Sequence, residues 1–283
     1  MAMSGYAIEM NSVAKRYGKR CILDGFDLAV PKGAVYALLG NNGAGKSTSI
    51  RLMTGQLLAD SGKISVLGLD PVKEAVALRL RLGYVAETER LFDFLTPPEL
   101  FAFLKHFFPD WSDRRATELL HRFRLPADKK IGSFSRGMYA KTALITVMAR
   151  RPELVILDDP ALGLDTVSRS DFMTQLIESI QEYEHTILLS SHLISEVEGV
   201  CDHVGILRNG KLLYSQDTDS LKSRFRRIRL PGVKTAEATG EICRKKIAGE
   251  TYAVADVSVN RSLGNEGEAM TLEEIFLALT DGE

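Results

Sequence analysis

The chain of 283 residues has little of what marks secreted or membrane-spanning proteins. Its three cysteines, Cys21, Cys201 and Cys243, lie far apart and form no metal-binding pair, so we expect reduced thiols in the cytosol. No apolar stretch approaches the about 18 residues that a membrane-crossing helix needs. The first residues lack a basic segment followed by an apolar one, so we expect no secretion signal. These absences predict a cytoplasmic chain that does not itself span a bilayer.

Charge of one sign is not in excess either. Lys and Arg number 36 against 37 for Asp and Glu, which gives a formal net charge of −1. Without a basic field over the whole molecule, we expect no nucleic-acid partner. Hydrophobic residues make up 45% and charged residues 26%, values typical of globular proteins. The length accommodates one large α/β domain with small subdomains.

Residues 40–48 fit the phosphate-loop pattern G-x-x-x-x-G-K-[ST], and their surroundings agree with it. The apolar run 34–39 predicts a buried strand, and residues 47–57 predict a helix. The glycines allow backbone N–H groups to turn inward, and the helix N-terminus adds partial positive charge. The alternative is an ordinary glycine-rich turn. The predicted phosphate-binding residues are Gly40, Asn41, Asn42, Gly43, Ala44, Gly45, Lys46, Ser47 and Thr48.

Two side chains of this loop, and one acid further along the chain, have individual predicted roles. Lys46 is expected to neutralise the β- and γ-phosphates of a nucleotide, and the Ser47 hydroxyl to bind Mg²⁺. The apolar run 154–157 is followed by Asp158. A buried strand that delivers an acid at its carboxyl end places the acid beside the metal, so Asp158 is predicted as a Mg²⁺ ligand.

Asp159 and His192 are the predicted catalytic side chains at the ends of two strands. Asp159 follows Asp158 directly and is expected to orient or deprotonate the attacking water. The alternative is a charged loop after a core strand. A further apolar run, residues 186–191, ends at His192, where an imidazole can reach a γ-phosphate. Taken alone, such a histidine is more often a hydrogen-bonded core or surface residue.

In their order along residues 6–215, these motifs make the chain resemble the nucleotide-binding subunit of ABC transporters. The resemblance implies a P-loop NTPase fold of the α/β class, with a mainly parallel central sheet, an antiparallel β-subdomain and an inserted helical subdomain. It implies ATP and Mg²⁺ as cofactors. Six elements in order are much more specific than one phosphate loop. The matched positions outside the loop are Tyr17 (adenine stacking), Glu87 (Q-loop), Ser135, Arg136 and Gly137 (signature, acting on a second subunit), Asp158 (Walker B), Asp159 (catalytic acid), Asp165 (D-loop) and His192 (switch histidine).

Three of these positions depart from the family pattern. Glu87 replaces a glutamine, and as an anion it is still expected to ligate Mg²⁺ or its water. Arg136 adds bulk and charge where the signature has glycine, a variant that resembles the ABC-2 branch, which includes the Ytr-like subunits. Asp159 replaces glutamate and retracts the carboxylate by about 1–1.5 Å, and misplacement by about 1 Å can cost on the order of 100-fold in rate. We therefore expect weak or partner-dependent ATP hydrolysis.

The predicted domain organisation is an ABC ATPase domain over residues 1–220 and a small α+β extension over 221–283. Short strands in 6–32 and 61–70 are expected to form the antiparallel subdomain, and residues 91–150 the helical subdomain. Six of the twelve phenylalanines fall between Phe92 and Phe108. They are interpreted as the core of that subdomain, or as a groove for a helix of a membrane partner.

The extension carries no catalytic constellation. Its basic run between Lys222 and Arg229 is interpreted as a solvated face, with an anionic lipid or partner contact as the alternative. Residues 271–274 read as a capping box before a helix over residues 275–279.

By resemblance, the chain is expected to power an exporter from the inner face of the cell membrane. ATP would join two ATPase subunits, as a homodimer or as a heterodimer with another ABC subunit, and separate transmembrane permease chains would carry the cargo. Two alternatives remain. One is a soluble ABC ATPase that remodels DNA or ribosomes, and the other is a regulatory subunit that binds ATP with little hydrolysis.

Overall fold

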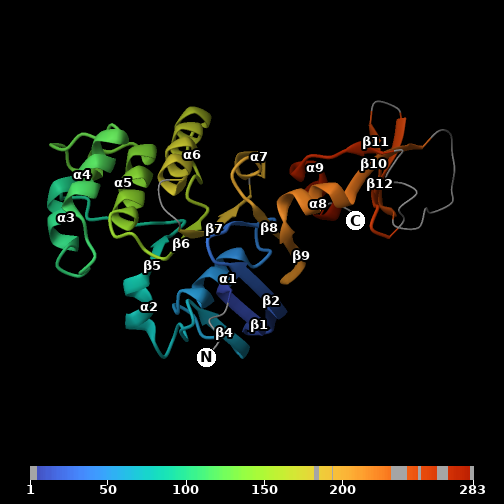
Figure 1. Ribbon diagram of the computed structural model, residues 1–283, viewed down its shortest axis with the longest axis horizontal. Helices are drawn as coiled ribbons and strands as arrows, with labels where there is room; N and C mark the ends of the chain where they lie inside the picture. Colours follow the sequence, from blue (N-terminus) through green and yellow to red (C-terminus); the bar gives the residue numbers. More distant parts are fainter. Residues whose placement is uncertain are drawn as a thin grey trace.

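The computed structural model describes residues 5–181, 185–192, 194–230, 241–247, 250–259 and 267–280. Within them, the strands form sheets of six, three and four strands (Figure 1). The helical subdomain lies at one end of the molecule and the C-terminal extension at the other (Figure 1). Among the described residues, no helix is both long and apolar enough to cross a membrane.

The central sheet has the strand order β5-β6-β7-β3-β8-β9. Its first five strands are parallel and β9 is antiparallel to β8, which confirms the mainly parallel sheet. The middle strands are buried on both faces, as their continuous apolar runs require. In sheet order the strands are β5 (Leu82–Val85), β6 (Leu154–Asp158), β7 (Thr186–Ser191), β3 (Val35–Leu39), β8 (His203–Arg208) and β9 (Lys211–Asp217).

The antiparallel subdomain is a three-stranded sheet in the order β2-β1-β4. We expected several short strands here, whereas β1 (Tyr6–Tyr17) and β2 (Arg20–Pro31) have 12 residues each. Register shifts within their pairing let the strands continue through residues that break the apolar alternation. The third strand is β4 (Ser61–Val66).

The helical subdomain is inserted between β5 and β6, as the resemblance implied. Its first helix begins with a capping box, in which the Glu99 carboxylate accepts hydrogen bonds from the backbone N–H and the hydroxyl of Thr96. That helix ends at Leu104. The helices of the insertion are α3 (Pro97–Leu104), α4 (Asp113–Arg122) and α5 (Arg136–Met148), with a 3₁₀ turn at Ile131–Ser133. The remaining helices up to residue 200 are α1 (Lys46–Met53), α2 (Ala75–Arg81), α6 (Thr166–Gln181) and α7 (Ile194–Val197).

In its described residues, the C-terminal extension is a four-stranded antiparallel sheet with two helices. Its first helix runs across the predicted boundary at residue 220. The predicted capping box is present, because Thr271 and Glu274 exchange backbone-to-side-chain hydrogen bonds of 2.9 and 3.2 Å. The elements are α8 (Thr218–Arg224), β10 (Phe225–Leu230), β11 (Glu241–Ile247), β12 (Glu250–Asp256), β13 (Glu268–Ala269) and α9 (Leu272–Thr280).

The extension shares its apolar core with the ATPase part. Buried Ile194, Val197 and Cys201 belong to the same cluster as Leu272 and Ile275 of α9. Most side chains of the basic run form ion pairs with acids of the same chain. Neither the solvated face nor the lipid or partner contact anticipated these pairs. The pairs are Lys222–Glu198 (2.7 Å), Arg224–Asp256 (2.7 Å), Arg227–Glu268 (2.7 Å) and Arg227–Glu274 (3.0 Å).

Candidate functional site

The glycine-rich loop connects β3, at the centre of the sheet, to α1. Gly43 and Gly45 adopt φ angles of 79° and 118°, a region that side-chain-bearing residues rarely enter. A Cβ atom on Gly40 would lie 2.8 Å from the carbonyl oxygen of Leu207 in β8. The loop therefore depends on glycine at these three positions, for backbone conformation at two and for space at the third.

Lys46 begins α1, and its amine points back to the loop. Nζ donates to the carbonyl oxygens of Gly40 at 2.6 Å and Asn41 at 3.4 Å, and the residue is 8% exposed. Burial lowers the pKa of Lys46, and the charges of Asp159, Asp158 and Glu87 oppose this shift. Two influences therefore act on the ammonium group: the three carboxylates attract its charge, and burial deprives it of hydration. A phosphate would supply the strong acceptors that it lacks.

Asp158 lies at the carboxyl end of β6, buried against two hydroxyl groups. Its Oδ1 accepts hydrogen bonds from Ser47 Oγ at 3.2 Å and Ser190 Oγ at 2.8 Å. Burial raises the pKa of Asp158, and the hydrogen bonds from Ser190 and Ser47 work against that rise. The carboxyl end of β6 and the start of α1 are thus joined by the hydrogen bond from the Ser47 hydroxyl to the Asp158 carboxylate.

This oxygen cluster fits Mg²⁺. The cation is usually bound through one or two carboxylates plus substrate phosphates, so it needs no cage of protein acids. In the part of the chain that the structure describes, no group of three or more His, Cys, Asp or Glu side chains has metal-binding geometry. Ser47 and Asp158 already converge, and Glu87 lines the same cavity, so these three would hold Mg²⁺ together with the phosphates.

Asp159 and His192 form a hydrogen-bonded pair next to this cluster. His192 Nδ1 lies 2.6 Å from Asp159 Oδ2, and the two side chains are 29% and 14% exposed. The backbone of Asp159 has a φ of 47°, and its N–H donates to Ser190 through the carbonyl oxygen at 3.2 Å and Oγ at 3.0 Å. Aspartate enters this left-handed region more readily than most residues with side chains. The two predicted catalytic residues are therefore brought together.

A cavity of about 390 Å³ joins the phosphate loop to Glu87, Asp158 and Asp159, whereas His192 is not among its lining residues. Sequence reasoning missed Arg20, Ile22 and Leu162 among its lining residues. The Arg20 guanidinium reaches the loop, since a Cβ on Gly43 would be 3.9 Å from it. Tyr17, which pairs with Arg20 across the hairpin, is 47% exposed and does not line the cavity. The lining residues are Arg20, Ile22, Asn42, Gly43, Gly45, Lys46, Ser47, Thr48, Glu87, Asp158, Asp159 and Leu162.

The signature residues lie outside the cavity of their own chain. Ser135 caps α5 by accepting a hydrogen bond from Met138 N at 3.3 Å, and Arg136 and Gly137 form the first turn. Asp165 caps α6, where Ser168 donates to its carboxylate through N at 3.0 Å and Oγ at 2.6 Å. These hydrogen bonds lower the pKa of Asp165. Ser135, Arg136 and Asp165 are exposed at these helix starts, whereas Gly137 is buried.

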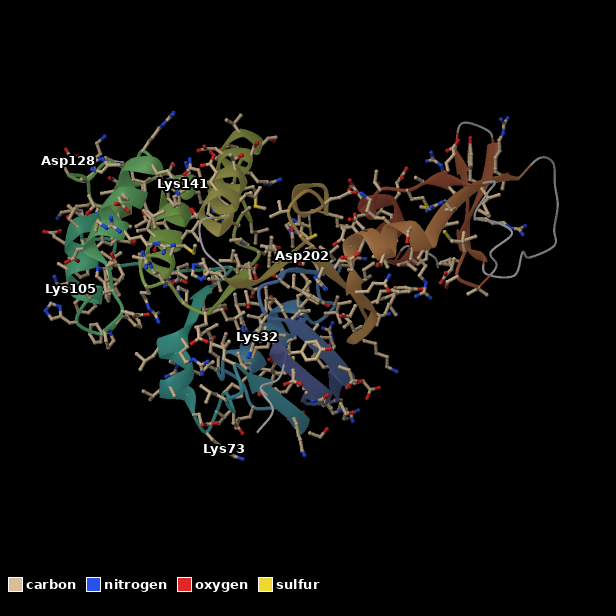
Figure 2. All side chains as sticks on the ribbon, viewed as in Figure 1. Lys32, Lys73, Lys105, Asp128, Lys141 and Asp202 are labelled. Atoms are coloured by element: carbon tan, nitrogen blue, oxygen red, sulfur yellow. The ribbon has the colours of Figure 1, made fainter. Side chains whose placement is uncertain are left out.

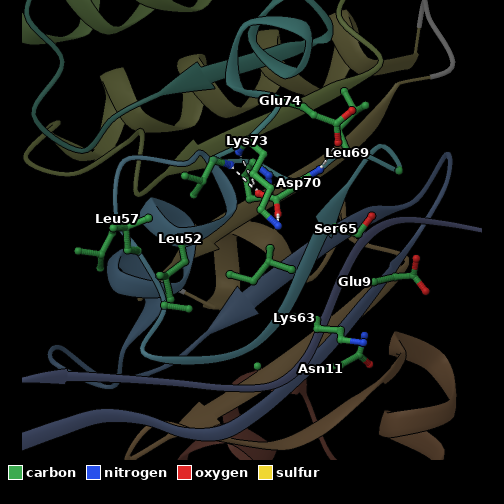
Figure 3. A pocket seen from close by; sticks show the side chains of 17 residues that line it. Glu9, Asn11, Leu52, Leu57, Lys63, Ser65, Leu69, Asp70, Lys73 and Glu74 are labelled. Carbon is green, nitrogen blue, oxygen red and sulfur yellow. Dashed lines mark hydrogen bonds and ion pairs between the residues drawn. The ribbon is translucent and has the colours of Figure 1, made fainter.

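A larger cavity, about 730 Å³, lies between β4 and residues 68–74 (Figure 3). Two of its acids, Asp70 and Glu74, are used locally: Asp70 accepts from the N–H groups of Val72 and Lys73, and Glu74 accepts from Asp70 N. Lys73 also forms an ion pair with Asp70 at 3.5 Å. These contacts shape a turn, and we assign the cavity no chemistry.

Comparison with known proteins agrees with the geometry of the smaller cavity. The family model described as ABC transporter matches residues 23–162. The ABC transporter ATP-binding protein YtrB of Bacillus subtilis (strain 168) is 30% identical over 223 residues, covering 79% of this chain and 76% of that protein.

Two further similarities extend this agreement. The bacitracin transport ATP-binding protein BcrA of Bacillus licheniformis is 34% identical over 78% of this chain and 72% of that protein. A solved structure of an ATP-binding subunit of an ABC transporter superposes with a TM-score of 0.68 at 29% identity, over 76% of this chain and 92% of that one.

Proposed function

The chain belongs to the family of ABC transporter ATP-binding proteins, of the YtrB-like ABC-2 type, and from this premise we propose that it binds and hydrolyses Mg·ATP to drive a membrane exporter. One observation carries the proposal: Lys46, Ser47 and Asp158 converge on a single cavity next to the Asp159–His192 pair.

The proposed chemistry is phosphoryl transfer to water. When bound, Mg²⁺ would neutralise charge on the β- and γ-phosphates. Lys46 would exchange the carbonyl oxygens of the loop for phosphate oxygens, and the loop N–H groups would add donors. The Asp159 carboxylate would accept a proton from, or orient, the attacking water. His192 would hold that carboxylate in place through its ring nitrogen and would sense the γ-phosphate.

We propose that the complete site forms between two copies of the chain. Each copy carries both halves, the Lys46 loop and the Ser135–Gly137 turn, and the second half lies outside its own cavity. Closure would bring Ser135, Arg136 and Gly137 of one copy onto the γ-phosphate held by the other. ATP drives closure only if it binds the closed state more tightly than the open one.

The helical subdomain is the proposed contact with separate transmembrane chains. Glu87 lines the nucleotide cavity, and a few residues later Phe92 and Phe94 are 44% and 65% exposed. Their rings pack edge-to-face, and Phe103 joins them with its centroid 5.3 Å from that of Phe92. An exposed aromatic patch so close to the site suits an apolar helix of a partner, with Glu87 between nucleotide and patch.

Export is the proposed direction of transport. Relatives include daunorubicin resistance protein DrrA3 of Streptomyces coeruleorubidus and the Nod factor export ATP-binding protein I of Burkholderia orbicola (strain AU 1054). The inner face of the membrane is the location that this role requires.

Lys46→Ala tests the proposal directly. We expect loss of ATP binding and of transport by the complex purified with its membrane chains. The control is Lys105→Ala, because Lys105 forms an exposed ion pair with Asp113 on the helical subdomain, and this variant should bind ATP normally. A complex that transports normally with the Lys46 variant would remove the energy-coupling role and leave a regulatory one.

A further inference from the structure

We propose that Arg136 is a positioning residue within its own subunit, where its guanidinium holds the turn of residues 159–165 and thereby the Asp159 carboxylate. The inference rests on the proposed ATP hydrolysis. It gives a cis role to the arginine that replaces a signature glycine, in addition to any contact with a second subunit.

The guanidinium of Arg136 lies directly over Gly163. Its Nη1 donates to the Gly163 carbonyl oxygen at 3.5 Å. A Cβ atom built on Gly163 would be 2.2 Å from Nη1 and 2.5 Å from Cζ, so the guanidinium fills the space of a missing side chain. Gly163 also has a φ of 73°, which disfavours any side chain. The two residues are matched in size and in hydrogen bonding.

Gly163 is connected to Asp159 by a short hydrogen-bonded turn. Leu162 N donates to the Asp159 carbonyl oxygen at 3.0 Å, and Leu164 N donates to that of Ala161 at 3.2 Å. The other side of Asp159 is fixed to Ser190. A shift of Gly163 therefore moves the turn that sets the orientation of a short carboxylate, and a misplacement of about 1 Å can cost on the order of 100-fold in rate.

A second contact holds the N-terminal turns of α5 and α6 together. A Cβ on Gly137 would lie 3.3 Å from Ser168 Cβ, so the first turns of α5 and α6 touch. Lys141 and Asp171 form an ion pair one turn further along the same helices. Arg136 extends this interface to the turn that carries Asp159.

Hydrogen exchange in the nucleotide-free protein isolates the cis role. In Arg136→Gln we expect the amides of Leu162 and Leu164 to exchange about two- to fivefold faster, because one weak contact has been removed from the turn. Arg114→Gln is the matched control, since Arg114 is 78% exposed in the first turn of α4. An arginine that acts only on the nucleotide of a second subunit predicts unchanged exchange, and that result would overturn the inference.

Kinetics with the membrane partner give the second readout. We expect Arg136→Gln to lower kcat with little change in KM for ATP, and Arg136→Lys to recover part of the rate because the ammonium still reaches the carbonyl. The double variant Arg136→Gln/Gly163→Ala should show the same increase in hydrogen exchange as Gly163→Ala alone, because both changes break the same contact. If the wild-type complex hydrolyses no ATP, the proposed function fails. If it does and Arg136→Gln matches it in kcat and exchange, only this inference fails.

Discussion

At the scale of single residues, the site depends on charges held in a poorly hydrated place. Asp158 is 3% exposed, and burial raises its pKa while two hydroxyl groups stabilise its ionised form. A carboxylate must be ionised to bind Mg²⁺, so metal binding is present above this pKa and is lost as the pH falls through it. The acid limit of Mg·ATP binding should therefore lie above the usual aspartate range.

Ser190→Ala tests this electrostatic balance. Loss of the hydroxyl removes the larger of the two hydrogen bonds that oppose the rise in pKa, so the pKa of Asp158 should rise further. We expect the acid-side midpoint of Mg·ATP binding to move upward. The midpoint is measured by the binding of a fluorescent ATP analogue at fixed Mg²⁺ over a range of pH. Protonation of the nucleotide affects wild type and variant equally, so it cancels in the comparison. A midpoint that stays or moves downward would contradict the assignment.

Asp159→Glu tests whether the short carboxylate limits the rate. The extra methylene should bring the carboxylate closer to the water, and we expect kcat to rise by on the order of tenfold or more. Glutamate tolerates the φ of 47° less well, so thermal stability should fall slightly, by up to about 1 kcal/mol. Steady-state ATPase assays and a melting curve separate the two effects. An unchanged or lower kcat would show that the length of the acid is not limiting.

At the scale of helices and strands, much of the arrangement could be predicted from the sequence. The hairpin of β8 and β9 turns at Asn209-Gly210, a dipeptide typical of two-residue hairpin loops, and both residues adopt positive φ angles, of 48° and 76°. Buried parallel strands are recognisable because their apolar runs are continuous. The long bulged strands β1 and β2 were not predictable in the same way, since bulges interrupt the period of two.

The residues of the nucleotide cavity were likewise only partly predictable from the sequence. The phosphate loop could be identified because its chemistry is contained in one short segment. Arg20 could not, because it reaches the loop from a strand whose register is set by cross-strand pairing, and a single arginine at the start of a strand carries no local signal. The roles of Tyr17 and Asp165 toward a nucleotide or a second subunit remain predictions.

The docking of the C-terminal extension on α7 gives a prediction at this scale. Glu198 Oε1 lies 2.7 Å from Lys222 Nζ and accepts a hydrogen bond from Leu272 N at 3.2 Å. We expect Glu198→Ala to cost about 1–2 kcal/mol and lower Tm by about 2–6 °C. Glu118→Ala, which removes an exposed pair with Arg114 at 3.8 Å, is the control and should stay within about 0.5 kcal/mol. Equal effects would mean that Glu198 does not hold the extension.

At the scale of the whole molecule, the helical subdomain lies at one end and the C-terminal extension at the other (Figure 2). Exposed Phe92 and Phe94 belong to the helical subdomain, and the nucleotide cavity is lined by the loop after β3 and by the end of β6. The extension packs on α7, which begins two residues after His192, and Arg208 donates to the Leu279 carbonyl oxygen at 3.1 Å. Its position relative to the ATPase part could not be predicted, because the contacts join residues about 70 positions apart, as the 71-residue separation of that pair illustrates.

The most direct test of the account is the mass of the Asp159→Asn chain measured by light scattering with and without Mg·ATP. Asparagine should slow hydrolysis and leave binding intact, so the nucleotide stays in place. We predict a doubling of mass with Mg·ATP, none with Mg·ADP, and none with Mg·ATP when Ser135→Arg is added, because the bulky side chain blocks the second half of the site. ATP bound to a chain whose mass does not change would contradict the claim that ATP joins two copies.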